Sequence, residues 1–209
     1  EERNAVRGRN PINYVPKGEI ISITKVLQDV HPDARDAFSR FLNGLDEKYP
    51  GYKMILSSIG RSFEKSASLK LKNSKNATPG LSKHNYHAAM DFNIIDPNGK
   101  IYKKSGYKMD WINSGIIDLA KSIEDPNGNQ LIKWGGDFAN YEDDIHFYYN
   151  FDIYTAYRNA LLKSPEDINK VDVFEVNLGK TRIKPNNDGE PNPNKELGNE
   201  QGFEETFIK

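Results

Sequence analysis

One long segment of the chain repeats its hydrophobic residues with helical spacing. After Pro32 and Asp33, apolar residues stand at relative positions 0, 3, 4, 7, 8 and 11, namely Ala34, Ala37, Phe38, Phe41, Leu42 and Leu45. This spacing places one apolar stripe along a helix, and a Pro followed by an acidic residue is typical of a helix start. Because Tyr49–Pro50–Gly51 breaks the pattern, we predict one amphipathic helix that ends before it.

Apolar and polar residues alternate strictly in a second segment, residues 88–95. Ala88, Met90, Phe92 and Ile94 face one way, whereas Ala89, Asp91 and Asn93 face the other. Such alternation is typical of a strand with one buried face. Similar patterns predict further strands over residues 52–57, 131–134 and 144–149, with a possible one over 171–178. Helices are predicted over residues 62–72, 111–123 and 151–164.

The predicted helices and strands do not alternate regularly, which favours an α+β fold, a small antiparallel sheet flanked by helices. A chain of 209 residues can bury one good core. We therefore expect one domain over residues 21–164, preceded by an extended arm over residues 1–20. Residues 165–209 hold 6 basic and 10 acidic residues and turn rich in Asn, Pro and Gly, so we expect an acidic C-terminal extension there.

Composition narrows the functional classes only slightly. The net charge of −1 gives no pointer to nucleic acid, and no apolar run approaches the roughly 20 residues needed to cross a bilayer. The chain has no cysteine, so disulfides are excluded and a zinc site would have to use nitrogen and oxygen ligands.

Three of the four histidines lie in two short segments that also carry carboxylates. His84 and His87 precede Asp91, and His146 follows Asp143. If residues 84–91 were helical, His87 and Asp91 would share a face, as in known zinc motifs. On a strand, His87 would lie about 13 Å from Asp91, and His84 would need a turn that folds it back. The residues alone leave both His84 and His87 open as metal ligands.

The second segment is easier to interpret. His146 alternates with Ile145 and Phe147, so its side chain leaves the apolar face, and Asp143 lies just before this strand. Two imidazoles and one carboxylate leave a fourth zinc position open for water, as in catalytic sites. Zinc lowers the pKa of such a water from about 15.7 to about 7. A carboxylate such as Asp143 can then take the proton and pass it to the leaving amine of a peptide, so the pattern predicts a zinc peptidase.

The order of these motifs resembles a known family. Ser82-x-His84-x6-Asp91, the run 134–138 (WGGDF) and Asp143-x-x-His146 are similar to motifs of the zinc D-alanyl-D-alanine carboxypeptidase and L-alanyl-D-glutamate endopeptidase family. That family includes VanY-type carboxypeptidases and bacteriophage endolysins. Residues 58–62 (SIGRS) are similar to its Gly-aromatic-Arg-Ser motif, although Ile59 and Gly60 depart from it. The resemblance spans roughly residues 25–150 and implies the Hedgehog/D,D-peptidase-like zinc peptidase fold.

The resemblance also implies roles for individual residues. It makes His84, Asp91 and His146 the zinc ligands and Asp143 the general base. It makes Arg61 the residue that holds a substrate carboxylate or polarises the scissile carbonyl, with Ser82 and Trp134 supporting and lining the site. It thus favours His84 over His87, which stands where the family usually has Gly and which we expect in the substrate cleft.

From this resemblance we expect a hydrolase that cuts peptidoglycan stem peptides. Carboxypeptidases of the family tend to carry Glu where this chain has Asp143, whereas its endopeptidases often carry Asp, which favours cleavage between L-Ala and D-Glu. The alternatives are a D-alanyl-D-alanine carboxypeptidase, or a non-catalytic virion or wall-binding protein that retains the fold. We expect a monomeric catalytic domain that acts at the bacterial cell wall, with arms bound to a larger (virion) assembly. Its source would be a phage lysin or virion component, or alternatively the bacterial periplasm or exterior.

Overall fold

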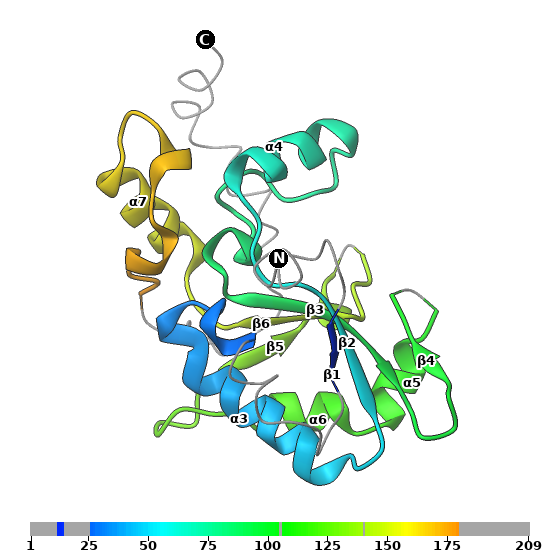
Figure 1. Ribbon diagram of the computed structural model, residues 1–209. Coiled ribbons are helices and arrows are strands. Elements are labelled where there is room, and N and C mark those ends of the chain that lie inside the picture. Colours follow the sequence, from blue (N-terminus) through cyan, green and yellow to red (C-terminus); the bar gives the residue numbers. More distant parts are fainter. Residues whose placement is uncertain (1–11, 15–25, 105, 140, 180–209) are drawn as a thin grey trace.

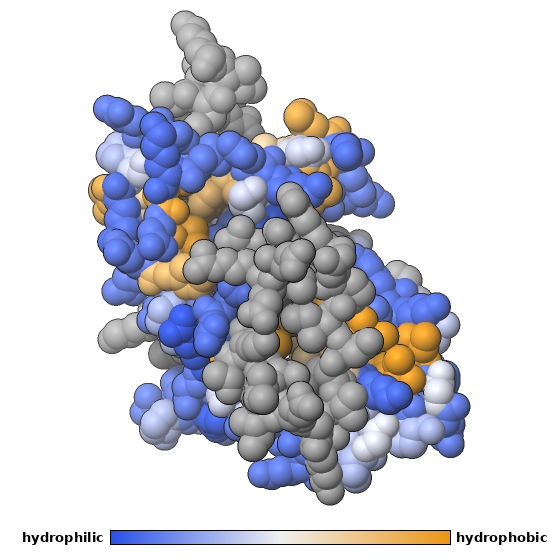
Figure 2. Space-filling view, in the orientation of Figure 1, coloured by the Kyte–Doolittle hydropathy of each residue, from blue (hydrophilic) through white to orange (hydrophobic). Residues whose placement is uncertain are grey.

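The computed structural model describes residues 12–14, 26–104, 106–139 and 141–179. Most of the expected N-terminal arm and residues 180–209 of the expected extension lie outside these residues. No helix in the described part of the chain is long and apolar enough to cross a membrane. Figure 2 shows a mainly hydrophilic face, with hydrophobic residues gathered in a few places.

A six-stranded sheet forms the centre of the molecule (Figure 1). Its order is β1 (Ile12–Tyr14), β2 (Lys53–Ser58), β3 (Ala89–Ile95), β6 (His146–Tyr149) and β5 (Ile132–Trp134), and β4 (Ile101–Tyr102) also pairs with β3. Every one of these pairings is antiparallel. The predicted α+β class with a small antiparallel sheet is therefore confirmed. The strand β1 lies within the expected N-terminal arm, so part of that arm belongs to the sheet.

The helices fall close to their predicted places. They are α3 (Pro32–Lys48), α4 (Phe63–Lys72), α5 (Lys108–Asn113), α6 (Ile116–Lys121) and α7 (Ile153–Lys163). The described residues also form four short 3-10 turns, η1 (Lys83–Tyr86), η2 (Gly135–Asp137), η3 (Ile168–Lys170) and η4 (Val173–Glu175). The single helix predicted over 111–123 is wrong, because Gly115 adopts a φ of 77° and separates α5 from α6. That left-handed conformation suits glycine and interrupts a helix.

The helix α3 covers one face of the sheet with the apolar stripe that its sequence predicts. All six of its predicted apolar residues are buried, and Phe41 packs against Phe92 of β3 and Phe147 of β6. The Phe92 and Phe147 rings stack with centroids 4.8 Å apart, and Trp111 of α5 packs on both. Because side chains alternate along a strand, the neighbours of Phe92 and Phe147 must point to the opposite face. In Figure 1, α4 and α7 lie on that other side.

The described part of the C-terminal segment, residues 165–179, packs onto the body of the protein. Val176 is 1% exposed and Leu178 is fully buried. The backbone N–H of Leu178 also donates to Asp33 Oδ2. The expected domain boundary at residue 164 therefore falls inside the packed region, which continues to about residue 179.

His31 joins this segment to the start of α3. Its Nδ1 accepts a hydrogen bond from the backbone N–H of Asp33, and its Nε2 lies 2.9 Å from the carbonyl oxygen of Val176. A neutral imidazole satisfies both contacts, with Nε2–H donating to Val176 and Nδ1 accepting. Burial lowers the pKa of His31, although the nearby Asp33 carboxylate opposes this shift.

We predict that His31 makes stability depend on pH. Because the folded state resists protonating His31, the unfolded state binds more protons below the ordinary pKa of 6.5. The free energy of unfolding should therefore start to fall near pH 6.5 and continue to fall until the pH passes the folded-state pKa. Urea unfolding of the wild type and of His31→Gln between pH 7.5 and 5.0 measures this. The difference between the two proteins should change with pH; parallel curves would contradict the prediction.

Candidate metal and catalytic site

Pairing between β3 and β6 brings two of the predicted ligands together. Asp91 stands directly opposite His146 in the antiparallel register. Residues opposite one another in such a pair have Cβ atoms about 4.5–5.5 Å apart. Both side chains leave the face that carries Phe92 and Phe147, and His146 Nδ1 lies 2.8 Å from Asp91 Oδ1.

The turn η1 delivers the third predicted ligand. His84 Nε2 lies 3.2 Å from Asp91 Oδ1 and 3.1 Å from His146 Nδ1. The side chain of Asn85 holds this turn, donating to the Arg61 carbonyl oxygen and accepting from the Gly80 N–H. The turn supplies the fold-back that a ligating His84 requires.

His84, Asp91 and His146 form a cluster suited to a metal ion. One ligand atom from each lies within 4.8 Å of the others, and the three residues are buried or half-buried. Zinc sits about 2.0–2.2 Å from such ligands, so ligand atoms of a tetrahedral site are roughly 3.3 Å apart, close to the separations seen here. His84 Nδ1 lies 2.7 Å from the Ile59 carbonyl oxygen, so that nitrogen carries the proton and Nε2 offers its lone pair to the cluster.

The electrostatics of Asp91 suit a ligand. Burial opposes its ionisation, but His84 and His146, when protonated, hold the pKa of Asp91 well below its usual range through their charge and hydrogen bonds; the neutral form of His84 is the one that would bind zinc. The carboxylate therefore stays charged at neutral pH. A charged carboxylate between two imidazoles is a donor set that zinc accepts.

Asp143 lies at the edge of this cluster, at the start of the turn into β6. Its carbonyl oxygen accepts from the His146 N–H at 2.9 Å, and its side chain is 15% exposed. The ammonium nitrogen of Lys104 lies 3.0 Å from Asp143 Oδ1. This contact is an ion pair, because Oδ1 receives no hydrogen bond from a described residue.

Arg61 lies beside His84, one of the predicted ligands. Its backbone N–H donates to the His84 carbonyl oxygen at 2.9 Å. Its guanidinium group forms no hydrogen bond or ion pair with any residue in the described ranges, although it is only partly exposed. A cation left without a partner next to a metal cluster is available for an anionic group of a substrate.

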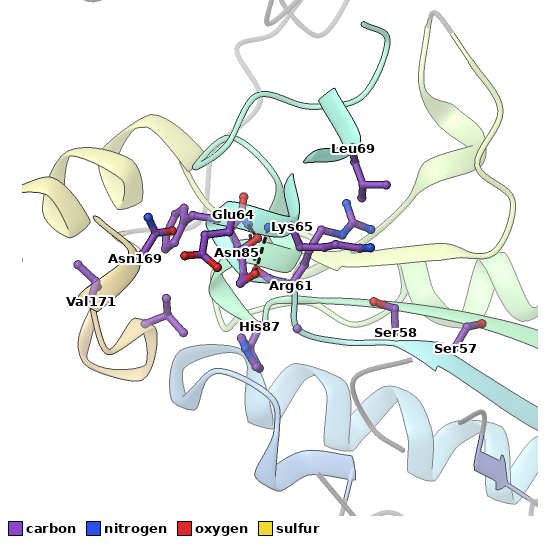
Figure 3. A pocket seen from close by; sticks show the side chains of 14 residues that line it. Ser57, Ser58, Arg61, Glu64, Lys65, Leu69, Asn85, His87, Asn169 and Val171 are labelled. Carbon is purple, nitrogen blue, oxygen red and sulfur yellow. Dashed lines mark hydrogen bonds between the residues drawn. The ribbon is translucent and has the colours of Figure 1, made fainter. Parts of the chain in front are cut away.

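Next to Arg61 opens a cleft of about 850 Å³. It is lined by the end of β2, the start of α4, His87 and residues 169–173 (Figure 3). His87 is 9% exposed, lies outside the metal cluster and lines this cleft; its contact with a substrate stays a prediction.

Ser82 and Trp134 lie beneath the surface rather than in the cleft. Ser82 is 7% exposed and precedes η1. Trp134 is 2% exposed, and its indole N–H donates to the Asp144 carbonyl oxygen at 2.8 Å. Both can support the loops that carry the predicted ligands; neither lines the cleft beside Arg61, and their lining of the metal site stays a prediction.

Two residues near the cluster have no counterpart in the sequence analysis. Lys104 follows β4 in the chain, and no local pattern reveals its contact with Asp143. Tyr141 packs on Phe138 with ring centroids 5.2 Å apart, and Phe138 packs on His146. Burial and the charges of Asp143 and Asp91 raise the pKa of Tyr141 to about 12, against the opposing charge of Arg61. Its phenol thus keeps its proton and can donate a hydrogen bond near the cluster.

We predict that His84 and His146, but not His87, bind zinc. His146→Ala and His84→Ala should each weaken zinc binding by at least about 100-fold, because each removes a ligand. The matched control is His87→Gly, which keeps the positive φ of that position and should still bind one zinc ion per chain. Metal analysis after equilibrium dialysis measures all three. Loss of zinc in His87→Gly, with zinc kept in His84→Ala, would reverse the assignment.

The arrangement agrees with the comparisons with known proteins. A family model described as D-alanyl-D-alanine carboxypeptidase matches residues 75–149, which contain the metal cluster and Asp143 but not Arg61. The chain is also similar to the structure of the Serratia marcescens L-Ala D-Glu endopeptidase ChiX, with a TM-score of 0.43 and 23% identity over 61% of this chain and 86% of that chain. No curated protein matches the chain. The match over residues 75–149 confirms the resemblance seen in the motifs and indicates a hydrolase.

Proposed function

We propose that this protein is a zinc metallopeptidase that hydrolyses peptidoglycan stem peptides between L-Ala and D-Glu. The observation that carries the proposal is the cluster of His84, Asp91 and His146, with Asp143 and Arg61 beside it. These five residues supply a metal site, a carboxylate base and a cation for an anionic substrate. Its partner would be the bacterial cell wall.

Each residue has a definite task in this reaction. His84, Asp91 and His146 would hold zinc, whose chemistry at such a site is to polarise a carbonyl and to lower the pKa of water. The Asp143 carboxylate takes a proton from the attacking water and gives it to the nitrogen of the broken peptide bond. Lys104 keeps that carboxylate in place through its ion pair.

Arg61 would bind the α-carboxylate of D-Glu, which lies next to the bond that is cut. Its backbone hydrogen bond to His84 supports a place for the guanidinium group near the reacting carbonyl, where it would also favour developing negative charge. The Tyr141 hydroxyl is a second donor in the same region.

The shape of the cleft supports an endopeptidase over a carboxypeptidase. A carboxypeptidase removes one terminal residue, so it needs a site that closes just beyond the group that binds the terminal carboxylate. Here the cleft continues past Arg61 to the residues around Val171. An open cleft can hold the stem residues that follow D-Glu, and Asp143 in place of Glu agrees with this choice.

We further propose a phage lysin or virion component as the source, with the chain termini contacting a larger assembly. This rests on the likeness of the motifs to bacteriophage endolysins. A genomic neighbourhood made only of bacterial housekeeping genes would count against it.

We predict zinc-dependent cleavage that requires Asp143. Zinc-loaded wild type incubated with peptidoglycan should release fragments with new ends at L-Ala and D-Glu, detected by mass spectrometry, and a chelator should abolish them. Asp143→Asn should lower kcat by at least about 100-fold, the scale of a lost general base. The control is Asp144→Asn, which makes the same change at the next residue and should retain cleavage, because the Asp144 side chain is fully buried and cannot reach a substrate.

The alternatives have different outcomes in the same experiment. Release of free D-Ala would establish the carboxypeptidase. Absence of cleavage across several wall chemotypes, from folded and zinc-loaded protein, would support the non-catalytic protein.

We predict that Arg61 recognises the charge of D-Glu. Arg61→Met should lower kcat/KM on a stem peptide with D-Glu by about 10–100-fold, the value of a charge-assisted hydrogen bond. On the same peptide with D-isoglutamine, whose α-carboxylate is an uncharged amide, the loss should be much smaller. Equal losses on both peptides would show that Arg61 does not read this carboxylate.

A further inference from the structure

The cleft beside Arg61 has a wall that lies outside the family match. Residues 169–173 line it opposite the start of α4. Figure 3 shows Arg61 and Lys65 next to each other, with Glu64 on the side of Asn169 and Val171. Arg61, Lys65 and Glu64 form no ion pair with any residue in the described ranges, so their charges are available to a ligand.

The cleft wall is held in place by packing beneath it. The Phe174 ring packs against His87, with centroids 4.8 Å apart, and against His31 at 6.4 Å. Val176 and Leu178 follow in the chain and are buried. The segment from 168 to 178 is therefore a fixed part of the surface around the cleft.

His87 lies beneath this wall, in space that a side chain at residue 60 would otherwise fill. A Cβ atom at Gly60 would lie 2.1–2.6 Å from three atoms of the His87 ring, so the ring fits only because residue 60 is glycine. His87 itself has a φ of 54°, an unusual conformation for a residue with a side chain, and its Nδ1 lies 2.8 Å from the Asp29 carbonyl oxygen. Gly60 and His87 both depart from the family motifs. The two departures are linked, because the His87 ring fits only where residue 60 lacks a side chain.

The chemistry along the cleft identifies the ligand. Near the metal cluster it offers the cations Arg61 and Lys65, and beyond them the Glu64 carboxylate lies on the side of Val171. Val173 also lines this cleft. A carboxylate followed by an aliphatic chain that ends in an amine complements this order of charges. In a stem peptide, D-Glu followed by a diamino acid has these groups in that order.

We propose that residues 169–173 form the far wall of a subsite for the diamino acid that follows D-Glu. Its aliphatic chain lies against Val171 and Val173, and its amine pairs with Glu64. The proposal rests on the proposed function, because it places D-Glu at Arg61.

The test compares two substrates on the zinc-loaded full chain. One is N-acetylmuramoyl-L-Ala-D-Glu, and the other adds L-Lys after D-Glu. Wild type should have at least about a tenfold higher kcat/KM on the longer peptide. Val171→Trp, which fills the subsite, should remove this preference through KM and leave the shorter peptide unaffected. Leu162→Trp adds the same bulk on α7, where Leu162 is 78% exposed, and should behave as wild type.

A second pair of variants tests the amine. Glu64→Gln should abolish the preference for free L-Lys over Nε-acetyl-L-Lys, whereas Glu47→Gln, an exposed residue of α3, should retain it. Two results would overturn the proposal. One is an equal kcat/KM of wild type on the peptides with and without L-Lys, and the other is a Val171→Trp variant that is unchanged on both. Equal losses of Val171→Trp on both peptides would overturn it as well.

Binding separates this proposal from the proposed function. If wild type cleaves neither peptide, the proposed function fails. Titration of Asp143→Asn with the longer peptide then still tests the subsite. If adding Val171→Trp to Asp143→Asn weakens this binding by at least about tenfold, the subsite is supported. If Asp143→Asn shows no detectable binding of the longer peptide, the subsite is excluded.

Discussion

The antiparallel register between β3 and β6 is the constraint on which the site depends. It sets Asp91 opposite His146 on one face and Met90 opposite Phe147 on the other. The aromatic packing of Phe92 and Phe147 against α3 and α5 fixes that register, because a slip by one residue would turn both ligands into the core and both rings into the solvent. Burial of aromatic rings on one face therefore positions the ligands on the other.

The third ligand depends on a different kind of interaction. His84 is on a 3-10 turn, and its place is set by the side chain of Asn85 and by the Ile59 carbonyl oxygen. These are hydrogen bonds between segments more than 20 residues apart, so the site combines a rigid sheet with a turn that polar contacts hold. Asn85 is 1% exposed, and losing its hydrogen bonds would leave several buried polar groups unsatisfied.

Local patterns predicted the elements well and their long-range contacts poorly. The stripe of α3 and the alternation of β3 came directly from side-chain periodicity, which also put Asp91 on the polar face. The choice between His84 and His87 could not come from spacing, because it depends on a turn fixed by tertiary hydrogen bonds. Residues 171–178 look like a strand, yet Val173–Glu175 forms a 3-10 turn, since Asp172 caps it through the Phe174 N–H and the valines pack outside the sheet. Lys104 and Tyr141 reach the site through loops, which carry no periodic signal.

A single side chain, His31, links the start of α3 to the C-terminal segment. Its Nδ1 accepts a hydrogen bond from the Asp33 N–H in the first turn of α3. Its Nε2 contacts the Val176 carbonyl oxygen, in the segment that also lines the cleft. The catalytic body and its C-terminal segment are consequently not separable modules. A fragment cut at the end of α7 would uncover apolar surface that Val176 and Leu178 now cover, and it would lack one side of the cleft. The smallest unit that could be moved intact into another protein therefore extends through residue 179.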